Sequence, residues 1–173
     1  MVTIRNAEKM TYDALFDADM LLAQPSMVQE PRPTFDTGSV YSRMSLYLDS
    51  QIDSEVDVVK LVNFGLPISA FKRLDELMSI DFRLLGPETT IRRRLQEKQN
   101  FTVDESERLV RLARIAAKAE ALFGDSSAAK AWLATRADYL SDGTPISPLE
   151  LATTDSGARL VETLMLRTAH GIF

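Results

Sequence analysis

Hydrophobic positions recur at helical spacing through most of the chain after residue 54, and most regularly between Phe101 and Gly124. Apolar residues three and four positions apart form one face of a helix, so this segment is predicted to be a single long helix. Its apolar stripe consists of Leu109, Leu112, Ala116, Ala119 and Phe123, widened by Val110, Ile115 and Leu122. A basic row on another face consists of Arg108, Arg111, Arg114 and Lys118.

Both ends of this long helix are marked in the sequence. Thr102 is followed three residues later by Glu105, the spacing of a capping box in which each side chain satisfies a free backbone N–H. Gly124 stands where a left-handed residue would end the helix. A helix of about 20 residues is roughly 30 Å long, enough to join two helical subdomains.

Three shorter helices are predicted before it. Ser54 has the position of an N-cap for a helix that runs to Gly65, with Val56, Val59, Val62 and Phe64 as its apolar edge. Pro67 opens a second helix over 68–78, and Pro87 occupies the first position of a third over 88–100.

The helices 68–78 and 88–100 are separated by a short piece, IDFRLLG, which is the outline of a helix-turn-helix. If Ile91 and Leu95 face the core, the opposite side of the second helix is polar and suits contacts to DNA bases and phosphates. The candidate DNA-binding residues are Thr89, Thr90, Arg92, Arg93, Arg94 and Gln96. The alternative is a solvated surface helix in which Glu97 pairs with Arg93.

The rest of the chain is also predicted to be helical. A helix over 126–136 carries Trp132, which is expected in the core. Ser147 and Glu150 form a second capping box. The last helix begins at Thr154–Asp155 and has its apolar side marked by Leu160, Leu164 and Leu166.

The first fifty residues are the least regular. A helix over 7–23 has weak caps, three prolines follow, and Val40–Leu48 alternates imperfectly as a possible strand. We interpret residues 1–50 as a partly irregular arm or linker, the alternative being a flexible acidic tail. The prediction is an all-α chain with such an arm, a helix-turn-helix-like domain over 51–100 and a helical domain over 101–173.

Charge and composition restrict the classes of function that the chain can have. Residues 1–60 carry five Lys/Arg against ten Asp/Glu, whereas residues 61–173 carry fifteen of each, so the second part can hold a local basic patch. The chain has no cysteine and one histidine, which excludes a disulfide framework and a Cys- or His-rich metal site. It has no glycine-rich phosphate loop, signal-peptide layout or long apolar run, so we expect a cytoplasmic protein that is not an enzyme and needs no cofactor.

The segments DESERLVRLARI, ALFGD, AKAWL, PLEL and GARLVE…HGIF together resemble the Xre/MbcA/ParS toxin-binding family, the antitoxin half of bacterial RES–Xre toxin–antitoxin pairs. The resemblance is close over residues 90–173 and looser over 54–89, the Xre-like helix-turn-helix region. It implies an antitoxin that blocks the active site of a RES-domain toxin, a class that consumes NAD⁺. It also implies repression of the shared promoter, with operator DNA as a second partner; because two or three arginines bind DNA weakly, we expect a homodimer.

The C-terminus is the first candidate for toxin contact. His170, Gly171, Ile172 and Phe173 end the chain with two large apolar side chains, which would form a plug for the toxin pocket or else fold back on the chain's own core. His170 would donate a hydrogen bond to the toxin or only cap the last helix. Arg159 and Glu162 either pair with each other or face the toxin. A stand-alone DNA-binding regulator or helical adaptor without a toxin partner remains the alternative function.

Overall fold

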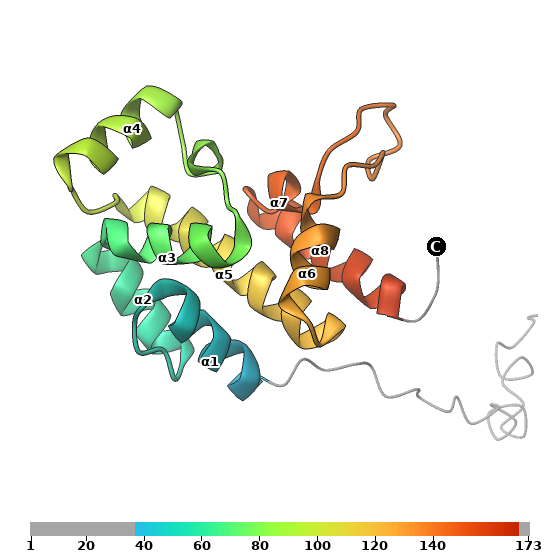
Figure 1. Cartoon of the computed structure of the whole chain (residues 1–173), viewed down its shortest axis with the longest axis horizontal. Helices are drawn as coiled ribbons and strands as arrows, with labels where there is room; N and C mark the ends of the chain where they lie inside the picture. Colours follow the sequence, from blue (N-terminus) through green and yellow to red (C-terminus); the bar gives the residue numbers. More distant parts are fainter. Residues whose placement is uncertain (1–36, 170–173) are drawn as a thin grey trace, which may run out of the picture. The chain divides into compact units, whose positions relative to one another are not determined.

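The structure is a computed structural model that describes residues 37–169, and these residues fold into helices that belong to one compact unit (Figure 1). The elements are α1 (Thr37–Leu48), α2 (Glu55–Phe64), α3 (Ile68–Met78), the 3₁₀ turn η3 (Phe82–Leu84), α4 (Glu88–Glu97), α5 (Val103–Phe123), α6 (Ser126–Ala134), α7 (Pro148–Leu151) and α8 (Asp155–Ala169). Extended pairing within 37–169 is limited to one isolated bridge between Ala137 and Ile146. The prediction of an all-α chain is confirmed. None of the helices in this range is long and apolar enough to cross a membrane.

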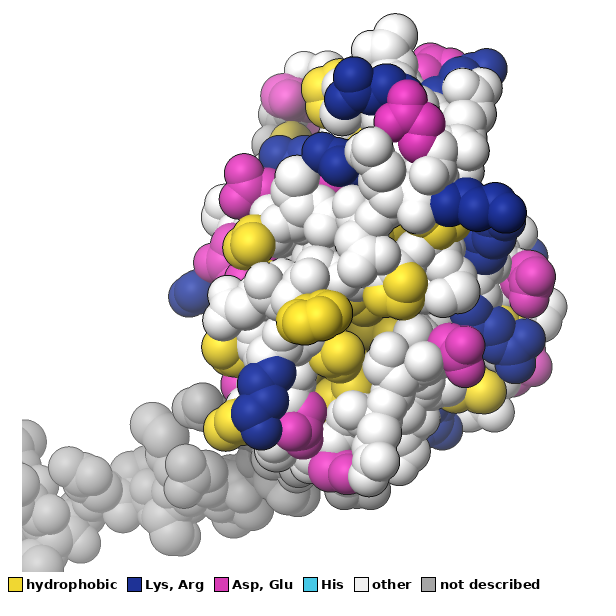
Figure 2. Space-filling view, turned by 90° about the vertical axis from the view of Figure 1, so that its left-hand side faces the viewer, with side chains coloured by type: hydrophobic (Ala, Val, Ile, Leu, Met, Phe, Trp, Pro, Cys, Tyr) yellow, Lys and Arg dark blue, Asp and Glu magenta, His cyan; other side chains and the backbone are white. Residues whose placement is uncertain are grey.

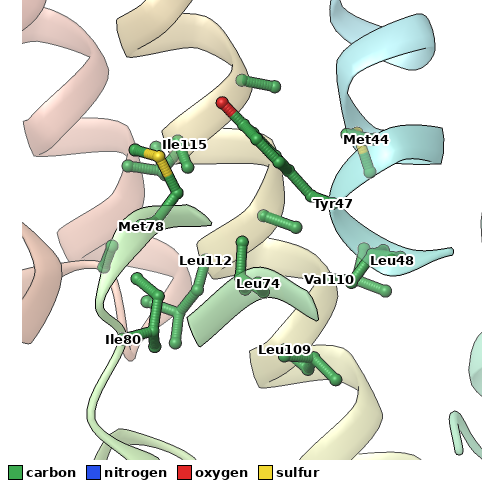
Figure 3. Packing of buried hydrophobic residues seen from close by; sticks show 14 of the residues in the cluster. Met44, Tyr47, Leu48, Leu74, Met78, Ile80, Leu109, Val110, Leu112 and Ile115 are labelled. Carbon is green, nitrogen blue, oxygen red and sulfur yellow. The ribbon is translucent and has the colours of Figure 1, made fainter. Parts of the chain in front are cut away.

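Helix α5 is the centre of this unit. It packs against α1, α2 and α3 on the N-terminal side of the chain and against α6 and α8 on the C-terminal side. Figure 3 shows side chains of α1 and α3 packed on its face, with Leu74 of α3 beside Leu112 and Tyr47 of α1 extending across α5. Alanines at 113, 116, 117 and 119 are fully buried, and their small side chains let neighbouring helices approach closely.

Both ends of α5 form as the sequence predicts. Thr102 accepts a hydrogen bond from the Glu105 N–H, and the Glu105 carboxylate accepts one from the Thr102 N–H at 2.8 Å. At the other end Gly124 has φ +70° and its N–H donates to the Glu120 carbonyl. The second capping box, Ser147 with Glu150, is also present and opens α7.

The side chains of the basic row on α5 bind to other segments of the chain. The Arg108 guanidinium donates to the Leu85 carbonyl at 2.8 Å, and Arg111 donates to the Thr153 carbonyl at 2.9 Å. Arg114 pairs with Glu55 of α2 at 2.8 Å, and Lys118 pairs with Glu162 of α8 at 2.7 Å. Because each cation reaches a different segment, the row ties α5 to its surroundings along its whole length.

A three-residue turn, Gly65-Leu66-Pro67, joins α2 to α3 and packs on the start of α5. The Phe101 N–H donates to the Leu66 carbonyl at 2.9 Å, and the Leu66 N–H donates to the buried Ser106 hydroxyl at 3.0 Å. Gly65 has φ +82°, and a Cβ placed there would lie 2.5 Å from the Phe101 carbonyl oxygen. This position therefore requires glycine for both conformation and space.

The structure corrects the prediction for the end of the arm. Val40–Leu48 is part of helix α1 and not a strand, because Val40, Met44, Tyr47 and Leu48 are spaced to lie on one helical face and are all buried. Residues 37–48 thus belong to the core. Residues 1–36, with the helix expected over 7–23, lie outside the described residues.

Three further details differ from the predictions. Pro87 is the N-cap of α4, whose first residue is Glu88. The connection between α3 and α4 spans residues 79–87 and includes η3, so it is longer than an ordinary helix-turn-helix turn. The buried stripe of α8 is Ala158, Val161 and Met165, which face the core, while Leu160, Leu164 and Leu166 flank them and are half-buried.

The apolar edge predicted for α2 is also wrong in part. Val58 and Val62 are the side chains that face α5 and are buried, whereas Val56, Val59 and Phe64 are exposed. A helix with apolar residues on both sides gives no unique inward face from its spacing alone.

The contact of Gly65 with Phe101 yields a stability prediction. Gly65→Ala should lower the free energy of unfolding by about 3 kcal/mol, because the substitution combines an unfavourable φ with a clash against backbone. Gly124→Ala is the matched control: its φ is also positive, but a Cβ there meets nothing within 4 Å, so it should cost only about 1 kcal/mol. Urea unfolding followed by circular dichroism measures both, and equal losses would contradict the assigned contact.

Candidate functional site

Helix α4 is attached to the unit by one narrow face. Ile91 is fully buried and Leu95 is half-buried, and the helix packs on η3. The inward placement of these two residues confirms the prediction from their spacing. The remaining side of α4 is polar.

Arg92 lies at the edge of α4 that faces η3. Its guanidinium pairs with Glu88 one turn earlier on the same helix and lies over the ring of Phe82, 5.7 Å from its centroid. Both interactions are at the surface, where they are worth a few tenths of a kcal/mol to about 1 kcal/mol. Arg92 therefore remains available to an approaching anion.

Arg94, on the other edge, holds α4 to α5. Its Nε lies 2.8 Å from Oε2 of Glu105, and the two side chains are only 17% and 9% exposed. Arg94 also donates to the Asn100 carbonyl at 3.4 Å. Since Glu105 is at the same time part of the α5 cap, this predicted DNA-binding residue has a structural partner that its position in the sequence did not indicate.

The outward side of α4 carries the remaining candidates. Thr89, Arg93 and Gln96 are exposed and Thr90 is half-buried. The ion pairs found among residues 37–169 do not include Arg93, so the structure does not form the alternative pair with Glu97. In Figure 2 the end where α4 lies carries several Lys and Arg side chains, interspersed with Asp and Glu side chains. This surface combines a free guanidinium with hydroxyl and amide groups, the side chains that contact phosphates and base edges.

On the C-terminal side, Arg159 and Glu162 do not pair with each other. Arg159 pairs with Asp155 at 3.0 Å in a fully surface-exposed pair, whereas Glu162 pairs with Lys118 of α5. Glu162 therefore fixes α8 to α5, and Arg159 projects into solvent with its side chain 78% exposed. Of the two, Arg159 is the one placed for contact with another molecule.

Both residues lie on the rim of a groove between α2, α5 and α8 with a volume of about 280 Å³. Its floor is apolar and includes Val58, Val62 and Val110. The sequence did not predict this groove, because its walls come from three segments that are distant in the chain.

The connection from α6 to α8 is ordered by polar contacts. Arg136 donates to the Glu150 carboxylate at 2.6 Å and to the Pro145 carbonyl at 2.7 Å. Partial burial acts to raise the pKa of Glu150, but the hydrogen bonds from the Ser147 N–H and Arg136 outweigh it and hold this pKa below its ordinary value. Gly157, in the first turn of α8, lies so close to α7 that a Cβ there would be 1.9 Å from the Leu151 carbonyl oxygen.

The ring of Trp132 packs on Phe123, with centroids 5.6 Å apart, where α6 meets the end of α5. It is half-buried against the core, as expected. The predicted plug, His170, Gly171, Ile172 and Phe173, lies outside the described residues. Groups of three acidic, histidine or cysteine side chains able to hold a metal ion are not found within 37–169.

Comparison with known proteins identifies relatives that match most of the chain. Residues 118–171 match the family described as the antitoxin Xre/MbcA/ParS C-terminal toxin-binding domain. The chain is 31% identical over 134 residues to "Antitoxin Xre" of Pseudomonas putida, covering 75% of this chain and 82% of that protein. It is 38% identical over 141 residues to "Antitoxin Xre" of Yersinia enterocolitica, covering 80% and 88%. A third relative with the same name, from Photorhabdus laumondii, is 33% identical over 118 residues, which cover 65% of this chain and 78% of that protein.

The two edges of α4 yield a prediction that separates structural from exposed arginines. Arg94→Ala should lower the free energy of unfolding by about 2–3 kcal/mol, because it leaves the buried Glu105 carboxylate without its cation. Arg92→Ala, on the same helix, should cost about 0.5 kcal/mol. Thermal unfolding of the two variants measures the difference. An Arg94→Ala protein as stable as Arg92→Ala would show that the ion pair between Arg94 and Glu105 does not stabilise the fold.

Proposed function

The chain belongs to the Xre family of antitoxins, and on this premise we propose that it neutralises a RES-domain, NAD-degrading toxin and represses the operon that encodes both proteins. The observation that carries the proposal is the match to antitoxins over three quarters of the chain, with the toxin-binding family reaching residue 171. The protein acts by binding and has no catalytic step of its own. The cytoplasm, where NAD⁺ and the operator are found, is its proposed location.

The toxin is held by the C-terminal region. Residues 170–173 follow directly on α8, and the match to the toxin-binding family includes the first two of them. In the proposed mechanism Ile172 and Phe173 enter the apolar part of the toxin's active-site pocket, and Gly171 lets the chain turn away from the helix. Arg159, exposed on α8, contacts the toxin surface beside the pocket. Glu162 serves this interface indirectly, by keeping α8 on α5.

The operator is bound by α4. Arg93 and Gln96 are exposed and suited to base edges, while Arg92 and the hydroxyls of Thr89 and Thr90 suit phosphates. Arg94 positions the helix through Glu105. One such helix makes few phosphate contacts and binds weakly, so we propose that a homodimer places two of them on successive half-sites.

A second candidate is a regulator that binds DNA without a toxin partner. The polar outer face of α4 would serve it equally well. The match to a toxin-binding family over α6, α7 and α8 favours the antitoxin, and the two are separated by whether the product of a neighbouring gene co-purifies with this protein.

Removing residues 170–173 should abolish or strongly weaken neutralisation, because the plug is lost while the described fold is kept. The measurement is NAD⁺ consumption by the purified toxin in the presence of full-length or truncated protein. Operator binding by the truncated chain is the control and should be unchanged. Full protection by the truncated chain would mean that the toxin is blocked by another surface.

Arg93→Ala should weaken operator binding by about 1–3 kcal/mol if its guanidinium reads a base. Arg73→Ala is the matched control, since Arg73 lies on α3 and pairs there with Glu76. Fluorescence anisotropy with labelled promoter DNA at two salt concentrations measures both affinities. Equal affinities for the two variants would indicate that α4 does not face the operator.

A further inference from the structure

The first residue of α4 carries a negative charge on a surface proposed to bind DNA. Glu88 follows the N-cap Pro87, and its side chain is 48% exposed. A carboxylate in the first turn stabilises a helix through the helix dipole, which would be its role in any surface helix. On a helix that approaches DNA, the same carboxylate is repelled by phosphates. Its position on α4 therefore matters for which DNA groups it meets.

The rotation of α4 places Glu88 at the edge of its outer surface. Ile91 is fully buried, Leu95 is half-buried and Arg94 is held by Glu105. This rotation leaves Glu88 on the flank that faces η3, beside the exposed Thr89. The recognition helix of a helix-turn-helix contacts base edges with its N-terminal residues. Glu88 thus lies at the end of α4 that would enter the major groove.

The ion pair between Glu88 and Arg92 can open without disturbing the core. Both side chains line an open hollow between α3, η3 and the first turn of α4, with a volume of about 450 Å³. They are 48% and 59% exposed, and the other contact of Arg92 is with the ring of Phe82 at the same surface. Exposed pairs one helical turn apart are weak. A phosphate can therefore take the Arg92 guanidinium and release the Glu88 carboxylate.

The charges of this hollow disfavour the DNA backbone. The charged side chains that line it are three carboxylates and two guanidiniums, from Asp75, Asp81, Glu88, Arg83 and Arg92. One of the guanidiniums is already engaged, since Arg83 Nε donates to Asp81 at 2.7 Å. A second phosphate would meet excess negative charge at this end of α4. The groups that a released carboxylate can bind there are hydrogen-bond donors on the bases.

We propose that Glu88 accepts a hydrogen bond from the N4 amine of a cytosine in the operator, while Arg92 moves to a neighbouring phosphate. A carboxylate can only accept hydrogen bonds. In the major groove cytosine presents its amine with no acceptor on the same base, whereas adenine places the N7 acceptor beside its N6 amine. The inference rests on the operator binding of the proposed function and adds to it the identity of one base.

The exchange of partners also acts against wrong sequences. In the free chain the charges of Glu88 and Arg92 neutralise each other. On the cognate site the guanidinium meets a phosphate and the carboxylate meets an amine. Where thymine or guanine replaces the cytosine, the carboxylate faces a carbonyl oxygen, which is also an acceptor. Glu88 thereby contributes to specificity through repulsion as well as through its hydrogen bond.

Selection from a library of DNA duplexes tests the assignment with the full chain. The randomised segment is long enough for two half-sites, and the wild type should enrich cytosine at one fixed position of each. Glu88→Gln should shift that position to adenine, because glutamine both donates and accepts and so suits adenine N6 and N7. Glu97→Gln is the matched control: Glu97 is an exposed carboxylate at the opposite end of α4, and the selected sequence should not change.

Fluorescence anisotropy on the selected duplex measures the size of the effect. Replacing the selected C·G pair by T·A should weaken binding of the wild type about 10-fold or more, whereas Glu88→Gln should bind the two duplexes with nearly equal affinity. On a duplex without the site, Glu88→Gln should bind more tightly than the wild type, because Arg92 no longer has a competing carboxylate. Thermal unfolding should be nearly the same for both proteins, since the side chain is exposed.

A cytosine preference that survives in Glu88→Gln would overturn the assignment. Weaker binding of this variant to every duplex by the same factor would do so too, and would leave Glu88 with a role in helix stability alone. In both cases the wild type still selects a site, so operator binding stands. A wild type that enriches no sequence would instead refute the proposed operator binding, and this inference with it.

Discussion

The whole described fold depends on the burial of α5. Five other helices pack on this one, and a helix surrounded in this way must both admit close neighbours and satisfy its polar groups. The alanines of its second half meet the first requirement. The basic row meets the second, since every cation in it reaches a carbonyl or carboxylate of another segment. Each unmade contact would leave a half-buried charge without a partner, which costs about 1–3 kcal/mol or more. The residues that make α5 look like a charged surface helix are therefore the ones that hold the unit together.

Helix α4 is the exception to this packing. The basic row of α5 makes its contacts with other segments. Helix α4 is held instead by Ile91, by Leu95 and by the ion pair between Arg94 and Glu105. The Glu105 carboxylate also closes the α5 cap, so the start of the central helix and the orientation of α4 depend on one side chain. The outer face of α4 therefore does not pack against the rest of the fold. A helix with one buried edge and one polar face is suited to contact a large polar partner, as the proposed operator contact requires.

Patterns among neighbouring residues predicted much of this fold, whereas contacts between residues far apart in the sequence were not predicted. The two capping boxes and the glycine at the end of α5 are read from residues three or four apart, and they form as predicted. The partners of Arg94 and Arg114 lie 11 and 59 residues away in sequence, a separation that no periodicity reports. Helix α1 was obscured because its apolar positions also fit an imperfect strand alternation, and only burial against α5 decides between the two. The inward face of α2 was misjudged for a related reason: both of its faces are apolar, one for the core and one exposed.

The part of the chain that matches the toxin-binding family begins inside α5 and not at its start. The match to the toxin-binding family begins at Lys118. Helix α8 nevertheless packs on α5 and pairs with it through Lys118 and Glu162, and the turn before α8 accepts a hydrogen bond from Arg111, which precedes Lys118. A segment cut at residue 118 would lose one wall of the core that supports α8. The relatives agree with this dependence, since the match to Xre antitoxins extends over 134 and 141 residues and includes the helices before α5. The surface proposed for the operator and the one proposed for the toxin are thus carried by a single compact unit. A toxin bound at the end of α8 would therefore be brought to the promoter together with α4.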